Sequence, residues 1–158
     1  MAVLQRLETY LSEHNIPYTK TVHPLAFTAQ EVAQAEHLSG RMIAKCVVLL
    51  ADDAYVMAVL PADSVVDLQE LRQAIGAAHL RLATEKEIAD LFPDCELGAM
   101  PPFGNLYGLS VYVENSLAQQ QTIAFNAGTH RDVVHLQFAD FRRAVEPMIL
   151  PFGRRVAA

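Results

Sequence analysis

One lysine stands inside a run of apolar residues, and it is the first residue of this sequence that could do chemistry. Lys45 lies within the stretch 42–50, which otherwise has the pattern of a strand with two apolar faces. A buried ammonium group is costly unless it is paired or opens onto a polar cavity. Two interpretations are open: Lys45 begins the strand and extends its ammonium to solvent, or it lies in the floor of a pocket for an anionic or carbonyl-bearing ligand.

Two later stretches could complete a site around that lysine. The stretch 94–108 is rich in glycine and proline, which predicts a shaped loop whose backbone N–H groups could contact an oxyanion or a phosphate. For Gly98 we consider two roles, either a close approach to the ligand or only a positive φ angle in a turn. The stretch 125–132 is a strand end that turns at Gly128 and presents a titratable His130, which on its own would be an ordinary surface histidine.

Other kinds of site find no support in the sequence. The six histidines show no paired metal-ligand spacing, so we expect neither a metal nor another cofactor. No nucleophile elbow, P-loop or dinucleotide-binding glycine motif is present, which argues against serine hydrolases, NTPases and dinucleotide enzymes. Cys46 follows Lys45 and would face the other way on a strand, so a structural thiol is favoured over a nucleophile.

Both helices and strands are predicted to position these residues. Apolar spacing and caps predict helices over 3–14, 28–36, 67–75, 84–92 and 138–145, with Thr28, Asp67 and Thr84 as N-caps. Strands are predicted over 18–22, 42–50, 55–60, 79–82, 109–114, 122–126 and 133–137, with Asp52 and Asp53 turning a hairpin. This mixture predicts the α+β fold class with a mixed sheet.

Length, composition and charge limit the number of domains, the compartment and the partners that we expect. The chain of 158 residues predicts one domain over 1–158, and its composition of 52% hydrophobic and 19% charged residues is typical of a folded globular protein. Without a signal peptide, a long apolar span or a disulfide framework, a cytoplasmic protein is expected, with no membrane partner. The net charge of −6 argues against DNA as a partner, although residues 131–155 hold five arginines that could meet a phosphate backbone.

Three segments together resemble a known family. Residues 43–48 (IAKCVV), 98–104 (GAMPPFG, a G-x-x-x-P loop) and 125–128 (FNAG) are similar in order and spacing to the YbaK-like aminoacyl-tRNA deacylases. That family is related to the editing insertion domain of bacterial prolyl-tRNA synthetase, and the likeness extends over roughly residues 16–145. It implies a mixed, partly rolled sheet surrounded by helices.

The resemblance also implies a function, namely a free-standing trans-editing hydrolase that removes wrongly attached amino acids from tRNA, with tRNA for proline as the expected substrate. Lys45 would hold the 3′-terminal adenosine or the ester, Gly98 would donate to the ester carbonyl, and His130 would be a third catalytic residue. Water would attack with help from the substrate's 2′-hydroxyl and without a metal. Further substrate-binding residues implied are Ala99, Met100, Pro101, Pro102, Phe103, Gly104, Asn126, Gly128 and Thr129.

Two features depart from the family pattern. Cys46 stands where some alanine-clearing relatives have a polar residue, so their specificity does not transfer directly. The acidic charge is unusual for a tRNA-binding protein, so the arginines of residues 131–155 or a partner aminoacyl-tRNA synthetase would support binding to the acceptor end. The alternative function is a non-catalytic module that binds a nucleotide or an RNA 3′ end in the same pocket.

Overall fold

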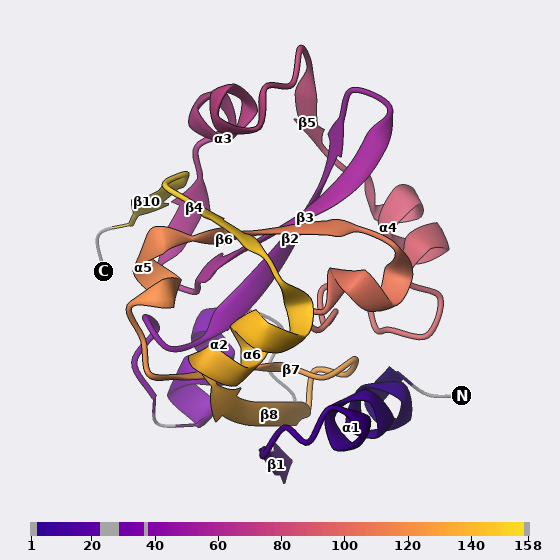
Figure 1. Cartoon of the computed structure of the whole chain (residues 1–158), viewed down its shortest axis with the longest axis vertical. Helices are drawn as coiled ribbons and strands as arrows, with labels where there is room; N and C mark the ends of the chain where they lie inside the picture. Colours follow the sequence, from indigo (N-terminus) through magenta and orange to yellow (C-terminus); the bar gives the residue numbers. More distant parts are fainter. Residues whose placement is uncertain (1–2, 23–28, 37, 157–158) are drawn as a thin grey trace.

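In the computed structural model, which describes residues 3–22, 29–36 and 38–156, a long antiparallel hairpin organises the chain (Figure 1). Its strands β2 (Ala44–Ala51) and β3 (Ala54–Pro61) pair along their whole length. Asp52 makes the turn with a φ of 52°, a left-handed conformation that aspartate tolerates. The predicted hairpin and its turn are therefore confirmed.

Three more strands extend this hairpin into a mixed five-stranded sheet of order β5-β2-β3-β6-β9. Strand β5 (Leu80–Leu82) runs antiparallel to β2, whereas β6 (Ser110–Glu114) and β9 (Met148–Leu150) add in parallel. Because β5 pairs only with residues 49–51, the first half of β2 has a neighbour in this sheet on one side only. That half is partly exposed at residues 45–47, so the expectation of two fully buried faces is wrong there.

A second, three-stranded antiparallel sheet has the order β1-β8-β7. It consists of β1 (Thr19–Val22), β8 (Asp132–Gln137) and β7 (Thr122–Asn126). The two sheets meet at one isolated parallel bridge between Ile43 and Ala124, beside a 3.0 Å hydrogen bond from the Ala124 N–H to the Met42 carbonyl. Among the described residues the ladder stops there, so β2 and β7 part just where Lys45 and Asn126 follow.

Six α-helices are present in the described part of the chain, and the predicted ones are confirmed to within a few residues. They are α1 (Val3–Glu13), α2 (Ala29–Ala35), α3 (Leu68–Ile75), α4 (Glu85–Leu91), α5 (Asn115–Ala118) and α6 (Phe138–Val145). Asp67 and Thr84 cap α3 and α4 as predicted, the latter in a complete capping box. The third predicted cap, Thr28, lies outside the described residues. Within those residues, none of the helices is long and apolar enough to cross a membrane.

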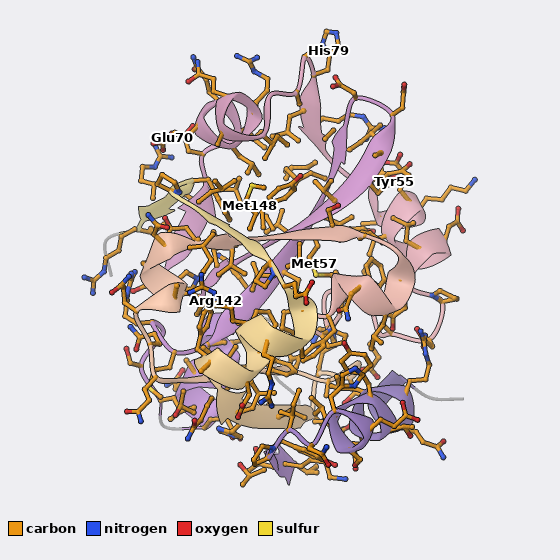
Figure 2. The ribbon with its side chains drawn as sticks, viewed as in Figure 1. Tyr55, Met57, Glu70, His79, Arg142 and Met148 are labelled. Carbon is orange, nitrogen blue, oxygen red and sulfur yellow. The ribbon has the colours of Figure 1, made fainter. Side chains whose placement is uncertain are left out.

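The main core lies between the two sheets and is closed by α1 and α6. Phe103 is fully buried there, with its ring centroid 5.7 Å from that of Phe125 and 5.4 Å from that of Phe141. Met57 of β3 is also fully buried and lies near the centre of the molecule, whereas His79 projects at its upper end (Figure 2). These contacts bind the central loop, the hairpin and the second sheet into one packed interior.

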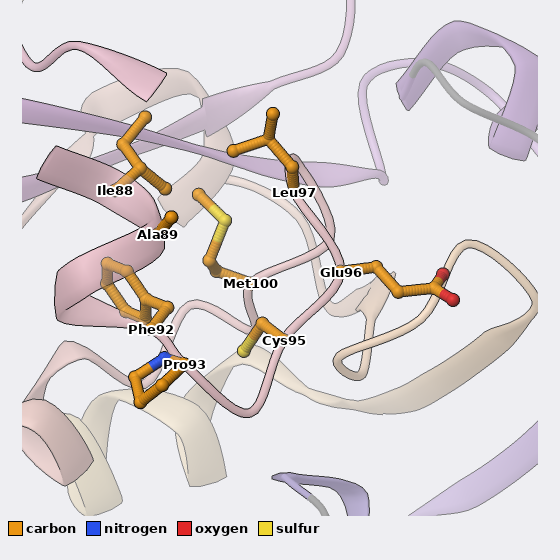
Figure 3. Close-up of a pocket in the computed structure, with 8 residues that line it drawn as sticks. All are labelled: Ile88, Ala89, Phe92, Pro93, Cys95, Glu96, Leu97 and Met100. Carbon is orange, nitrogen blue, oxygen red and sulfur yellow. The ribbon is translucent and has the colours of Figure 1, made fainter. Parts of the chain in front are cut away.

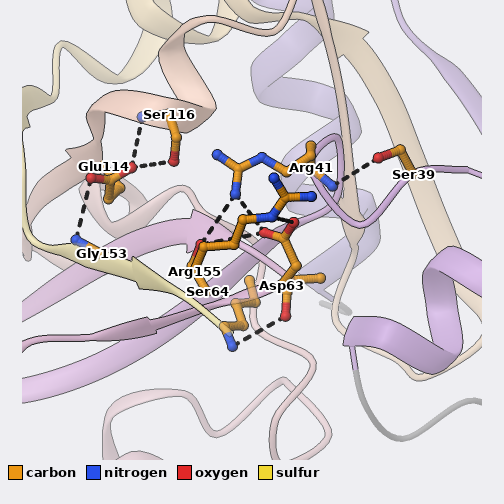
Figure 4. A network of polar contacts seen from close by, with 10 residues as sticks. Ser39, Arg41, Asp63, Ser64, Glu114, Ser116, Gly153 and Arg155 are labelled. Carbon is orange, nitrogen blue, oxygen red and sulfur yellow. Dashed lines mark hydrogen bonds and ion pairs between the residues drawn. The ribbon is translucent and has the colours of Figure 1, made fainter. Parts of the chain in front are cut away.

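Several short elements were not predicted from the sequence. They are strands β4 (Ser64–Val66), β9 and β10 (Gly153–Arg155), helix α5 and the 3-10 turn η1 (Gly104–Tyr107). Each has only three to four residues, too few to show a period. Strand β10 pairs with β4, and the Gly153 N–H donates to the buried Glu114 carboxylate at 3.3 Å (Figure 4). The three short strands therefore form through pairing with segments that are distant in the sequence.

Candidate functional site

A pocket of about 160 Å³ opens where β2 and β7 part. Four of the residues that line it were predicted for a site, namely Lys45, Gly98, Met100 and Asn126, and they come from three separate stretches of the sequence. The full lining comprises Ile43, Ala44, Lys45, Cys46, Gly98, Met100 and Asn126. The fold thus brings together the Lys45 ammonium, the Gly98 turn and the Asn126 carboxamide, although Lys45 and Asn126 lie more than eighty residues apart in the sequence.

Lys45 is half-buried in this pocket and does not begin the strand. Its ammonium donates a long hydrogen bond of 3.4 Å to the carbonyl oxygen of Ala62. Burial lowers the pKa of the Lys45 ammonium because it disfavours the charged form, and the nearby Asp63 carboxylate opposes that effect. Lys45 thus lies in the lining of a pocket, and its role toward an anionic or carbonyl-bearing ligand stays a prediction.

The Asp63 carboxylate is engaged mainly by arginines. Arg41 lies 2.7 Å from one carboxylate oxygen and Arg155 lies 3.4 Å from the other (Figure 4). The two arginines therefore share this carboxylate, which is not a dedicated counter-ion of Lys45. The five arginines of residues 131–155 are spread over three segments, the turn before β8, helix α6 and strand β10 (Figure 1).

Gly98 occupies a tight turn that only glycine adopts easily. The Ala99 N–H donates to the Glu96 carbonyl at 3.0 Å, and Gly98, the third residue of this turn, has a φ of 84°. Leu97 has no positive φ, so the turn has the form of type II, which requires a positive φ at its third position. A Cβ built on Gly98 would lie 3.6 Å from Cε1 of His130, an ordinary contact. The positive φ angle demands glycine here, whereas the surrounding protein leaves space for a Cβ atom.

Backbone hydrogen bonds fasten this turn to the loop that follows β7. The Glu96 N–H donates to the Gly128 carbonyl, and the Gly128 N–H donates to the Ala99 carbonyl, both at 2.8 Å. The Glu96 carboxylate in turn accepts the His130 N–H at 2.7 Å. The two loops therefore hold each other in place, and the position of Gly98 depends on both of them.

His130 is a buried residue, with 6% of its surface exposed, so the surface interpretation is wrong. Its Nε2 lies 2.8 Å from the Leu97 carbonyl oxygen and must be the donor, because a carbonyl only accepts. The carbonyl and the N–H of a trans peptide point in opposite directions. This hydrogen bond therefore turns the Gly98 N–H away from His130, and among the described residues no acceptor takes that N–H.

The remaining predicted site residues do not all reach the pocket. Met100 and Asn126 line it, and the Thr129 hydroxyl instead accepts the N–H groups of Arg131 and Asp132 within its own turn. Phe103 belongs to the aromatic core. Four others are buried in the loop behind the pocket lining: Ala99, Pro101, Pro102 and Gly104.

Cys46 contributes to the pocket as a protonated thiol. Its Sγ donates to the Met100 carbonyl at 3.3 Å, and burial raises the pKa of the Cys46 thiol because it disfavours the thiolate. A nucleophilic cysteine needs its thiolate form. The arrangement agrees with a structural role for this residue.

A second, mainly apolar pocket of about 120 Å³ adjoins the first (Figure 3). Met100 lines both pockets, and its side chain extends toward Ile88 and Leu97. Glu96 and Leu97 were not predicted as site residues, although a carboxylate two residues before the turn glycine was a usable signal. Met100 is thus a wall common to the two pockets.

Comparisons with known proteins agree on one family. The family model described as the aminoacyl-tRNA editing domain matches residues 23–144. The multifunctional Ser/Thr-tRNA deacylase ProXp-y of Escherichia coli K12 is 30% identical over 155 residues, which cover 95% of this chain and 92% of that protein. A proline–tRNA ligase of Lactococcus lactis is 26% identical over 90% of this chain, which spans 25% of the ligase.

The fold itself recurs in a solved structure of a candidate trans-editing enzyme for prolyl-tRNA synthetase. The TM-score is 0.84 at 20% identity, and the match covers 98% of both chains. At this identity the likeness concerns the fold alone. It confirms the expected α+β editing-domain architecture. Among the described residues, no group of three or more histidine, cysteine or acidic side chains is placed to hold a metal ion.

Proposed function

This chain belongs to the aminoacyl-tRNA editing domain family, and on that premise we propose that it is a deacylase acting in trans on mischarged tRNA. One observation carries the proposal: Lys45, Gly98 and Asn126 converge on a single small pocket. A cation and an outward-facing backbone N–H are the groups that an ester hydrolase needs near the developing negative charge.

The reaction is hydrolysis of the ester between an amino acid and the terminal ribose. The oxygen of water adds to the carbonyl carbon, and the carbonyl oxygen becomes an oxyanion. The bond from that carbon to the ribose oxygen then breaks, and the leaving oxygen takes up a proton. Free amino acid and uncharged tRNA result, with the substrate's own 2′-hydroxyl assisting the transfer of the proton.

Gly98 supplies the donor to the oxyanion in this scheme. Gly98 lines the pocket and its N–H has no acceptor among the described residues, so it is available to donate to the ester oxygen as charge develops. His130 acts through that peptide, because its Nε2–H is bonded to the Leu97 carbonyl and so orients the Gly98 N–H. We therefore assign His130 a positioning role in place of the catalytic role that the resemblance implied.

Lys45 holds the anionic side of the substrate. Its ammonium has only one long hydrogen bond to the protein in the described structure, so a ligand oxygen can compete for its remaining protons. The candidates are the ester oxygens and the phosphate of the terminal adenosine. Its partial burial strengthens such a contact because water screens it less.

The tRNA partner is proposed on the basis of the relatives. Similarity to proline–tRNA ligases favours tRNA for proline, and a synthetase would be a second partner that hands over the mischarged product. Such a protein would work in the cytoplasm, where tRNA is charged. Exposed arginines such as Arg131 and Arg142 would meet the tRNA backbone despite the acidic overall charge.

A deacylation panel tests the function. tRNA for proline carrying serine, threonine, alanine, cysteine or proline is incubated with micromolar protein, and the loss of ester is followed against the spontaneous rate. We expect faster loss for at least one non-cognate amino acid and none for proline. Binding of the RNA 3′ end without any acceleration would instead favour the non-catalytic module.

A further inference from the structure

We propose that the Asn126 carboxamide reads a hydroxyl group on the side chain of the substrate's amino acid, so that seryl and threonyl esters are preferred over alanyl esters. The inference rests on the proposed function and adds the residue that selects the substrate. Its basis is the position of Asn126 in the pocket, the state of its oxygen and the neighbouring charge.

The bridge between the sheets puts Asn126 beside Lys45. Ile43 and Ala124 are paired in parallel, and two residues further along each strand are Lys45 and Asn126. Side chains two residues apart on a strand share a face, so the ammonium and the carboxamide project on the same side. Both residues also line the same pocket.

The Asn126 oxygen lacks a hydrogen bond within the described structure. Its Oδ1 is buried, and no donor among the described residues reaches it. Leaving a buried acceptor unpaired destabilises a protein, and such groups in folded proteins call for a specific reason. A substrate that brings its own hydrogen-bonding group would remove this cost upon binding.

A hydroxyl group fits this carboxamide best. The last side-chain torsion of asparagine is soft, so either its oxygen or its nitrogen can face the ligand, and a hydroxyl pairs with both because it donates and accepts. The α-ammonium of the amino acid only donates, and it would be repelled by Lys45 on the same face. The methyl side chain of alanine neither donates nor accepts a hydrogen bond. With about 160 Å³ available, the pocket suits small side chains such as serine and threonine.

The experiment compares wild-type protein with Asn126→Leu, which preserves the approximate shape and removes both hydrogen-bonding groups. We measure kcat/KM for tRNA charged with serine, threonine or alanine. In parallel, we measure the affinity for the stable amides of serine and alanine with 3′-amino-3′-deoxyadenosine. Asn115→Leu, on the surface of α5, is the matched control.

We expect Asn126→Leu to lower kcat/KM for serine and threonine by about 10- to 100-fold and that for alanine by less than about 3-fold, because only the hydroxyl contact is lost. The preference of binding for the seryl amide should disappear as well, while Asn115→Leu changes neither quantity. An equal loss for serine and alanine would show that Asn126 reads the α-ammonium or only shapes the pocket, and it would overturn the inference.

An unchanged ratio of serine to alanine in Asn126→Leu would overturn it equally. If wild-type protein hydrolyses no ester, the proposed function fails, yet the amide affinities still decide the inference. A seryl amide that binds wild-type protein no better than the alanyl amide refutes the role of Asn126. This arm separates a failure of the function from a failure of the specificity.

Discussion

The Nε2 of His130 lies 2.8 Å from the carbonyl oxygen of Leu97, and the peptide that this hydrogen bond fixes is the one whose N–H belongs to Gly98. One imidazole thus sets the direction of the N–H of Gly98, a residue that lines the pocket. The His130 backbone is itself held by the Glu96 carboxylate at 2.7 Å. Under the proposed function, the position of the oxyanion donor therefore depends on His130, through the Leu97 carbonyl.

Replacing His130 tests this positioning role. His130→Phe removes the donor to Leu97, so we expect kcat to fall by about 100-fold with little change in KM, because a misdirected oxyanion donor affects the transition state. His130→Gln retains an N–H donor and should restore part of the loss. Steady-state kinetics below the melting temperature of each variant make the measurement. A parallel rise in KM, or equal losses for Phe and Gln, would contradict the assignment.

Lys45→Met should abolish detectable turnover while the protein stays folded. The substitution removes the cation that we propose holds the substrate, and it also removes the cost of a partly buried charge. Deacylation assays and circular dichroism on the same sample measure the two effects. Lys86→Met, at an exposed position on α4, is the surface control and should remain active. Unfolding of Lys45→Met would mark the lysine as structural.

The lowered pKa of Lys45 also predicts how stability depends on pH. The folded state disfavours the charged ammonium, so the penalty is complete below the lowered pKa and is relieved as pH rises toward the ordinary value of 10.5. Lys45→Met should therefore gain stability over wild type at pH 7, and this gain should shrink toward pH 10.5. Denaturant titrations at several pH values provide the measurement, and a gain that grows with pH would refute the argument.

Gly98→Ala should combine a modest loss of stability with a large loss of activity. At a φ of 84°, alanine costs about 1 kcal/mol, so the melting temperature should fall. Any shift of the peptide that relieves this strain moves the oxyanion donor, which costs about 100-fold in turnover. Gly108→Ala, at a φ of 75° with open space around it, is the matched control. Equal activity losses in the two variants at similar stability would leave Gly98 with a purely conformational role.

Met100→Ala should widen the range of amino acids that are removed. Met100 lines both the site pocket and the adjoining apolar pocket, so its truncation opens one toward the other. Relative kcat/KM should rise for larger esters such as valine and fall for serine. Met57→Ala, at a fully buried position in the core, controls for the stability of about 2–5 kcal/mol lost with such truncations. The same shift in specificity in both variants would remove Met100 from the selectivity argument.

Local sequence was sufficient for most of the framework. The caps at Asp67 and Thr84 and the turn at Asp52 depend on neighbours within a few residues, and the sequence displays such interactions directly. The long strands β2, β3, β6, β7 and β8 also follow from their composition. The short strands β4, β9 and β10 do not, because they exist only through pairing with distant segments.

Three features able to take part in chemistry could be recognised from the sequence alone: a lysine in an apolar run, a glycine-proline loop and a polar turn. Which of these residues lie close together depends on the packing of the whole chain. This packing placed Lys45 beside Asn126 through one bridge, buried His130 under Leu97, and took Phe103 into the core. The physical reason is separation along the chain: contacts between residues thirty to eighty positions apart arise from the packing of whole elements, which no local pattern records.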